Sequence, residues 1–275
     1  RVQLSRNLSF KDVRFQHEEI HYMSHEVNFM DRFQALGEGT KVDTLQLLSI
    51  RDSLTTASIP RWFSTRWSLI VASLTLCLLP LLIILSVFKL VDGNVPVFYA
   101  TLQFFIVYLL CNSHARQIAK QTAVIHDAAE NFLLLIKQVI TLQQLPSSLQ
   151  KEVEALRNAQ QQATLLNSII NRLDRRGNIL GLMLIDTFGL NDYFLIREYL
   201  RWEADFKNQI EAEVRALSHI DALVSWGRFA YNHPEATTAE VTSDTNVSVE
   251  AEEIYHPFLG TKAIKNNFSI VNGSY

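Results

Sequence analysis

WSLIVASLTLCLLPLLIILSVF (residues 67–88) and VPVFYATLQFFIVYLLC (residues 95–111) are the two uncharged stretches that decide the fold of this 275-residue chain. As α-helices they would be about 33 Å and about 25 Å long, and the hydrocarbon core of a bilayer is about 30 Å thick. They therefore predict two membrane-crossing helices joined by a tight turn, the second helix using a few flanking residues to cross. The alternative is a helical pair buried in a soluble core, which is rare for uncharged runs of this length.

Basic residues flank the hairpin at both of its open ends. Arg61 and Arg66 precede the first run, and Arg116 and Lys120 follow the second. Because loops rich in lysine and arginine stay on the cytoplasmic side, this pattern predicts that both termini are cytoplasmic. We therefore expect a multi-pass protein of the inner (cytoplasmic) membrane, with the lipid bilayer as a partner.

The composition excludes several classes of protein. A net charge of −3 gives no general attraction to nucleic acid, and few glycines and prolines favour long helices. Both cysteines, Cys77 and Cys111, lie in the apolar runs, so neither a disulfide framework nor a thiolate metal site is expected. The chain begins with arginine and ends on a strand-like run at residues 268–275, and we expect it to be a piece of a longer protein.

Amphipathic stretches outside the hairpin predict long helices. Apolar residues recur at three- and four-residue steps over Glu18–Leu36, and neither glycine nor proline interrupts the sequence from Asn112 to Leu145. The second crossing should therefore continue out of the membrane as one helix. The expected helices are residues 18–36, 42–50, the continuation over 112–145, one that starts at a capping box of Ser147 and Gln150 and runs to Arg176, and one from Ile185 or Asn191 to Tyr231.

The last of these helices has an apolar stripe and many charged residues. We expect the charged residues to cover the other faces of this helix, and a rod of this length to need a partner along its whole length. The charged residues are Arg197, Glu198, Arg201, Glu203, Asp205, Lys207, Glu211 and Glu213.

The sequence becomes strand-like near its C-terminal end. Residues 246–255 alternate between apolar and polar, residues 267–271 form a second short strand pattern, and Asn272-Gly273 is typical of a hairpin turn. A domain that contains β-strands is expected to begin here.

Few residues form a pattern that indicates catalysis or ligand binding, and no catalytic residue is predicted. Arg172, Arg175 and Arg176 could contact phosphate, but cations are favoured at a helix C-terminus in any case, and solvation is the competing interpretation. His114 and His126 lie on one predicted helix, and no further ligand is spaced to complete a metal site with them.

Gln103 is the one strongly polar side chain deep in the second apolar run. We expect it to form a hydrogen bond between helices. A transport role is the weaker alternative, because two crossings without a charged residue offer no polar path.

The C-terminal third carries a resemblance to a known family. IYHPFL (residues 254–259) is followed by AIKNNFSI (residues 263–270). These segments resemble the MutS family of DNA mismatch-repair ATPases, in which a His-Pro motif, a short asparagine-containing segment and a strand come just before the phosphate-binding loop. Residues 184–186, 197–202 and 216–223 resemble the lever helix of that family, and Glu18–Gly37 fits its N-terminal helical region. The chain is similar to short MutS-like proteins that have membrane helices in place of the mismatch-reading domains.

The resemblance implies a mainly α fold, in which a transmembrane hairpin is inserted in a MutS-type core and lever bundle, and a few C-terminal β-strands open a P-loop ATPase domain. The implied domains are an N-terminal helical core segment (1–60), the transmembrane hairpin (61–116), the long-helix core and lever region (117–235) and the first strands of a truncated ATPase domain (236–275).

The resemblance also implies ligands and partners. In the full-length parent these would be ATP and Mg²⁺, a second copy joined through the ATPase domain, and DNA. It would place His256, Pro257, Ile264 and Asn266 in the adenine pocket. The chain contains no Walker A or Walker B segment, so this piece alone should not hydrolyse ATP. It also contains no mismatch-reading domain, which argues against mismatch recognition.

A non-enzymatic membrane scaffold or signalling protein with a cytoplasmic helical bundle is the alternative function. The hairpin and the long helices alone would support it. It does not account for the His256-Pro257 segment and the strands that follow.

Overall fold

A computed structural model describes residues 10–39, 48, 49, 51, 59–177, 179–240, 249–256, 259 and 263–270. The described chain is mainly helical, with a two-stranded sheet near its C-terminal end. This confirms the prediction of a mainly α fold with a few C-terminal strands. It folds as two compact units. One unit comprises residues 32–143 and 151–220, and the other comprises residues 1–31, 144–150 and 221–275.

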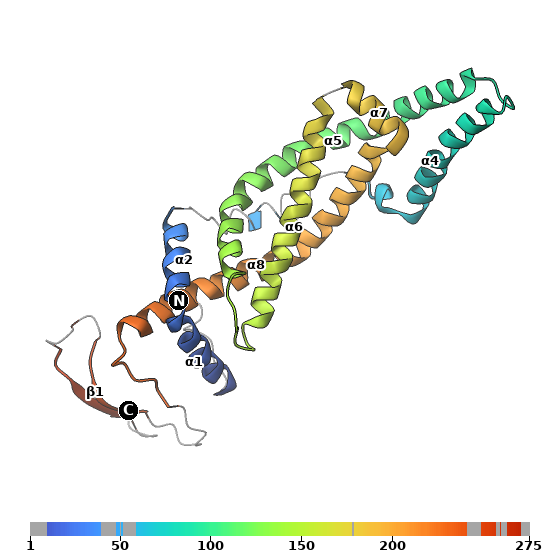
Figure 1. Cartoon of the computed structure of the whole chain (residues 1–275). Coiled ribbons are helices and arrows are strands. Elements are labelled where there is room, and N and C mark those ends of the chain that lie inside the picture. The colour runs from blue at the N-terminus through green and yellow to red at the C-terminus, as the bar shows by residue number, and fades with distance from the viewer. Residues whose placement is uncertain are drawn as a thin grey trace. The chain divides into compact units, whose positions relative to one another are not determined.

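The two apolar runs form an antiparallel helical hairpin, α4 (Arg66–Val87) and α5 (Asn94–Val139) (Figure 1). Both helices are long and apolar enough to cross a membrane. Thr65 caps α4 by accepting a hydrogen bond from the Ser68 amide at 3.2 Å, and the Asp92 side chain accepts one from the Asn94 amide at 2.8 Å in the turn. Within α4, only Ala72 and Leu79 are buried, so most of its apolar side chains are exposed or only partly buried.

Helix α5 continues without interruption from the apolar run into polar sequence, as predicted. It ends at Val139 rather than near Leu145. The Thr141 hydroxyl donates to the Gln138 carbonyl at 2.7 Å, and Gln144 has a left-handed backbone with φ of 51°. These local features end the helix without a glycine or proline, which is why the sequence pattern did not reveal its end.

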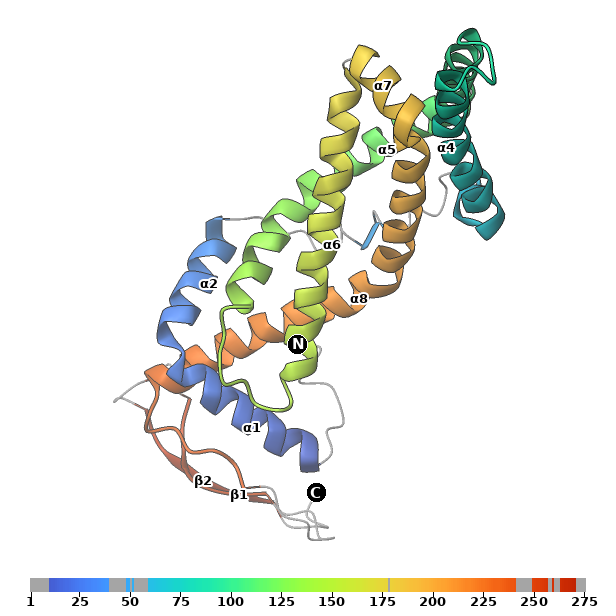
Figure 2. The same cartoon turned by 45° about the vertical axis from the view of Figure 1, so that its right-hand side comes forward.

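Two further long helices complete the first unit. Figures 1 and 2 show α6 (Gln150–Asp174) running beside the first half of α8 (Asn191–Asn232). The indole nitrogen of Trp202 on α8 donates to the Gln162 carbonyl on α6 at 3.0 Å. The buried side chains of α6 form one stripe and are Val153, Leu156, Ala159, Leu166, Ile169 and Leu173. Helix α6 begins at Gln150, so the predicted capping box at Ser147 is wrong. A turn closed by the Leu149 amide and the Pro146 carbonyl precedes the helix instead.

A short helix that the sequence pattern did not predict joins α6 to α8. After a 3-10 turn, η2 (Arg175–Gly177), helix α7 comprises Ile179–Gly189. Leu190 then adopts a left-handed backbone with φ of 46°, and α8 begins at Asn191. Of the two predicted starts of the last helix, Asn191 is therefore correct and Ile185 is wrong.

The predicted single helix over Glu18–Leu36 is wrong, because two helices occupy this stretch. They are α1 (Phe10–His25) and α2 (Val27–Gly39), separated at Glu26. The Ser24 hydroxyl and the His25 ring nitrogen Nδ1 each lie 2.8 Å from the His21 carbonyl oxygen. Side-chain hydrogen bonds of this kind compete with the backbone ladder, and they end α1 within an otherwise continuous apolar stripe.

In the second unit, α1 and the end of α8 approach closely at Gly227. A Cβ atom at this position would lie 2.7 Å from Met23 Cγ and 2.9 Å from Met23 Cβ, and Met23 is fully buried. The contact needs a residue without a side chain on α8. The neighbouring Arg228 forms an ion pair with Asp31.

Gly227→Ala is expected to lower the free energy of unfolding by about 1–2 kcal/mol, because the overpacking of Met23 outweighs the gain of about 1 kcal/mol in helix propensity. Thermal unfolding of the full chain in detergent micelles would measure the change. Gly37→Ala is the matched control, since no atom lies within 4 Å of its Cβ position in α2. It should stabilise the chain by up to about 1 kcal/mol. A stabilising Gly227→Ala would contradict the close contact.

The two C-terminal strands pair with one another. They are β1 (Val249–Ile254) and β2 (Asn266–Ile270), antiparallel, with Val249 opposite Ile270. The register shifts between Ala251 and Ile254, where Glu253 has a φ of 52°. The predicted turn at Asn272-Gly273 and nearly all of the predicted helix at residues 42–50 lie outside the described residues.

Candidate functional site

The helices of the first unit meet at a polar cluster beside the open end of the α4–α5 hairpin. Arg176 forms an ion pair with Asp192, with an Nη2 to Oδ2 distance of 2.8 Å, and it also donates to the Asn112 side chain of α5 at 3.1 Å. The Asp192 carboxylate is fully buried and the Arg176 side chain is 11% exposed. Arg176 therefore joins the turn η2 to the start of α8 and the middle of α5.

Asp186 of α7 adds a second buried carboxyl group to this cluster. One of its oxygens accepts a hydrogen bond from the Asp192 amide at 2.8 Å, and the other has no hydrogen-bond partner in the described part of the chain. Burial, together with the negative charge of Asp192, raises the pKa of Asp186 to about 6. Arg176 is thus the cation that two neighbouring acidic groups share.

Arg172 lies on the same side of α6, one turn earlier. It pairs with Glu198 and donates to the side chain and the carbonyl of Asn191, both at 3.2 Å. The structure thus directs Arg172 and Arg176 toward α8. Solvation alone therefore does not describe Arg172 and Arg176, whereas Arg175 between them is exposed.

Helix α8 also holds the segment that enters the hairpin. Arg197 is buried and donates to the Phe63 carbonyl at 2.7 Å and to the Thr65 carbonyl at 3.0 Å. The Tyr193 hydroxyl donates to the Ser68 hydroxyl oxygen at 2.9 Å. These bonds fix the first turn of α4 against α8, and they bury Arg197 although it lies outside the predicted apolar stripe.

Gln103 confirms the expected hydrogen bond between helices. Its side-chain nitrogen donates to the Thr187 carbonyl of α7 at 2.7 Å, and both residues are buried. The partner is the unpredicted helix α7 and not the other arm of the hairpin.

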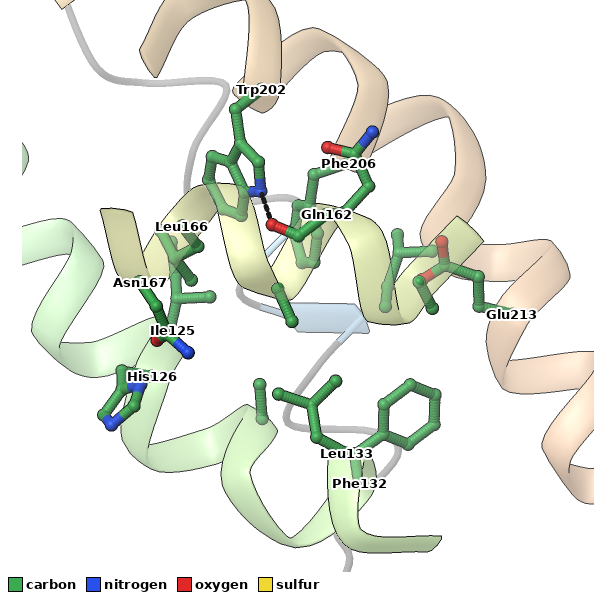
Figure 3. Close-up of a pocket in the computed structure, with 14 residues that line it drawn as sticks. Ile125, His126, Phe132, Leu133, Gln162, Leu166, Asn167, Trp202, Phe206 and Glu213 are labelled. Atoms are coloured by element: carbon green, nitrogen blue, oxygen red, sulfur yellow. Dashed lines mark hydrogen bonds between the residues drawn. The ribbon is translucent and has the colours of Figure 1, made fainter. Parts of the chain in front are cut away.

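A small cavity lies between α5, α6 and α8 (Figure 3). Its volume is about 40 Å³, which is room for water and not for a nucleotide. Most of its lining is apolar, and Glu213 and His126 are its titratable residues. Glu213 is 4% exposed, and burial raises its pKa to about 7. Glu213 and Glu203 are both buried, although they lie outside the predicted apolar stripe.

The residues implied for an adenine pocket lie on and around the two-stranded sheet. Asn266 pairs with Ile254 in the strand register, so Ile264 and His256 fall at the same end of this sheet. All three are exposed, with Ile264 82% exposed, and Asn266 donates to the Ile264 carbonyl at 3.3 Å. Pro257 lies outside the described residues. The structure brings these side chains to one end of the sheet without enclosing them.

Metal ligands do not gather in the described chain, where no group of three or more His, Cys, Asp or Glu side chains could hold an ion. The sequence had not pointed to Asp186, Asp192 or Glu213, because their burial depends on contacts between distant segments. The one local indication of a buried acidic group was Asp186, an aspartate in the otherwise largely apolar sequence of α7.

Comparisons with protein-family models, with curated proteins and with solved structures find no match to this chain.

Proposed function

We propose that the chain is the membrane anchor and helical lever of a MutS-like, ATP-dependent membrane protein that also binds DNA. The observation that carries the proposal is the continuity of α5, a single helix of 46 residues that begins in the apolar hairpin and continues into the helical bundle. At 1.5 Å per residue it is about 69 Å long, roughly twice the thickness of a hydrocarbon core. The part beyond the membrane is therefore mechanically continuous with the anchor.

The contacts of α8 support a lever role for this helix. Arg197 and Tyr193 hold the entry of α4, and Asp192 binds the arginine that reaches α5. In sequence, α8 is followed by the strands whose residues resemble those that precede a phosphate-binding loop. Nucleotide binding in a following domain would bias the position of α8, and its fixed contacts would transmit this bias to the hairpin.

ATP hydrolysis by the proposed parent protein, which would carry this chain together with an ATPase domain, tests the proposal. Reconstituted in phospholipid vesicles, this protein should hydrolyse ATP, and branched or mismatched DNA should raise the rate. If no DNA changes the rate of hydrolysis, DNA binding is removed from the proposal and the membrane ATPase remains. A protein that neither binds nor hydrolyses ATP would contradict the ATPase.

A membrane scaffold without enzymatic activity is the second candidate. The specific observation in its favour is the exposure of Ile264 and Asn266, which no described element covers. The same ATP-binding measurement distinguishes the two functions, since a scaffold would have no affinity for the nucleotide.

A further inference from the structure

Helix α7 has its polar and apolar sides reversed relative to a helix that faces water. Its polar residues Asp186 and Thr187 are buried against the bundle. Its outward face consists of large apolar side chains, among them Leu184, 62% exposed, and Phe188, 61% exposed. Among the α7 residues whose burial is described, the exposed large apolar side chains are Met183, Leu184, Ile185 and Phe188. A helix on a soluble surface normally points such residues inward, so this face calls for an apolar environment.

The position of α7 along the hairpin indicates what that environment is. Helix α7 packs against α5 and also against α4 (Figure 2). Its Thr187 carbonyl accepts the hydrogen bond from Gln103, which lies nine residues into α5 from Asn94. That separation corresponds to about 14 Å, close to the middle of a hydrocarbon core of about 30 Å. Part of α7 therefore lies at the level of the apolar run.

The polar cluster lies at a different level of the same helix. Asn112, which Arg176 contacts, is 18 residues from Asn94, or about 27 Å along α5. At this level, a membrane around the hairpin would present its headgroups. The exposed cations Arg66, Arg116 and Arg175 lie near this end of the hairpin in sequence or structure and suit anionic headgroups. The ion pair of Arg176 and Asp192 would thus remain at the interface, while α7 reaches beyond it.

We propose that α7 is a third, non-spanning membrane segment that enters the cytoplasmic leaflet beside α4 and α5. Its Met183, Leu184, Ile185 and Phe188 face contacts lipid acyl chains and continues the exposed apolar surface of the hairpin. Non-helical backbone at membrane depth must have its polar groups satisfied by protein. The Leu190 amide donates to the Asp186 carbonyl at 3.1 Å, and Gln103 satisfies the Thr187 carbonyl. This inference rests on the proposed anchoring of the hairpin in a bilayer.

Site-directed spin labelling in phosphatidylcholine vesicles tests the inference. The chain has two cysteines, so a label on Cys77 in a Cys111→Ala background reports on the outward face of α4. Leu184→Cys in a background without native cysteines reports on α7. Leu165→Cys on α6, where Leu165 is 43% exposed, is the matched control outside the membrane. Accessibility to oxygen, which concentrates in lipid, is compared with accessibility to a polar nickel chelate.

The label at Leu184 should resemble that at Cys77, with oxygen accessibility several-fold above that of the chelate, and the label at Leu165 should show the reverse. If Cys77 is in lipid and Leu184 is open to the chelate, α7 lies in water and the inference fails while the anchor stands. If Cys77 is in lipid and Leu184 is shielded from both reagents, a second copy of the chain covers α7 and the inference also fails. If the chelate reaches Cys77, the membrane anchoring itself fails.

Discussion

Replacing Arg176 by methionine is expected to lower the free energy of unfolding of the chain by about 3–5 kcal/mol. Arg176 is the cation that faces the fully buried carboxylates of Asp192 and Asp186. Its loss leaves Asp192 buried and unpaired beside a second acidic group, and an uncompensated buried charge is far more costly than a lost surface ion pair. Thermal or denaturant unfolding of the full chain in detergent micelles would measure the effect.

Arg175→Met is the matched control for Arg176→Met, because Arg175 is the preceding residue and is exposed. Its effect should stay within about 0.5 kcal/mol. Adding Asp192→Asn to Arg176→Met should recover part of the lost stability, since the orphaned charge is then absent. Equal effects of the two arginine substitutions would show that the cluster does not hold the helices together.

Glu213→Gln is expected to stabilise the chain relative to the native sequence, and increasingly so as the pH rises. Burial raises the pKa of Glu213 from its ordinary value of 4.5 to about 7 in the folded state. The native chain therefore has the full stability of a protonated Glu213 below pH 4.5 and loses it as the pH rises through 7. A shift of this size corresponds to about 3 kcal/mol, or about 6–12 °C in Tm. Melting temperatures of both proteins between pH 4.5 and 8 would measure it.

His126 provides the control for this pH dependence, since it lines the same cavity as Glu213 (Figure 3). The difference between Glu213→Gln and the native chain should persist when both also carry His126→Gln. A difference that is independent of pH would mean that Glu213 ionises in the folded chain as readily as in the unfolded chain.

The parts of the fold that could be predicted are those with a repeated pattern. The absence of charge over residues 67–88 and 95–111 predicted the hairpin, and the absence of breakers after Asn112 predicted that α5 would continue. Helix α7 was missed because it is short and apolar on most sides, so it has no periodicity to recognise. The break at Glu26 was missed because it depends on side-chain hydrogen bonds to a single carbonyl.

The candidate site could be predicted only where a residue is unusual for its own surroundings. The position of Gln103 in an apolar run predicted a hydrogen bond between helices, but it did not predict which residue would be the partner. Arg176 and Asp192 are 16 residues apart on different elements, and nothing in either local sequence indicates the pairing. In the sequence of α8, Glu213 and Arg197 cannot be distinguished from the charged residues of the same helix that face water. Their burial depends on which helices pack around α8.

In a membrane, the length of α5 would make the protein sensitive to the thickness of the bilayer. A hydrophobic segment that does not match the local thickness tilts to compensate. For a stiff helix of about 69 Å, a tilt of about 10° moves the far end by about 12 Å. Neither glycine nor proline interrupts α5 after Pro96 to absorb this motion. Embedded in a membrane, the chain would therefore convert the length of the surrounding acyl chains into a displacement of its helical bundle.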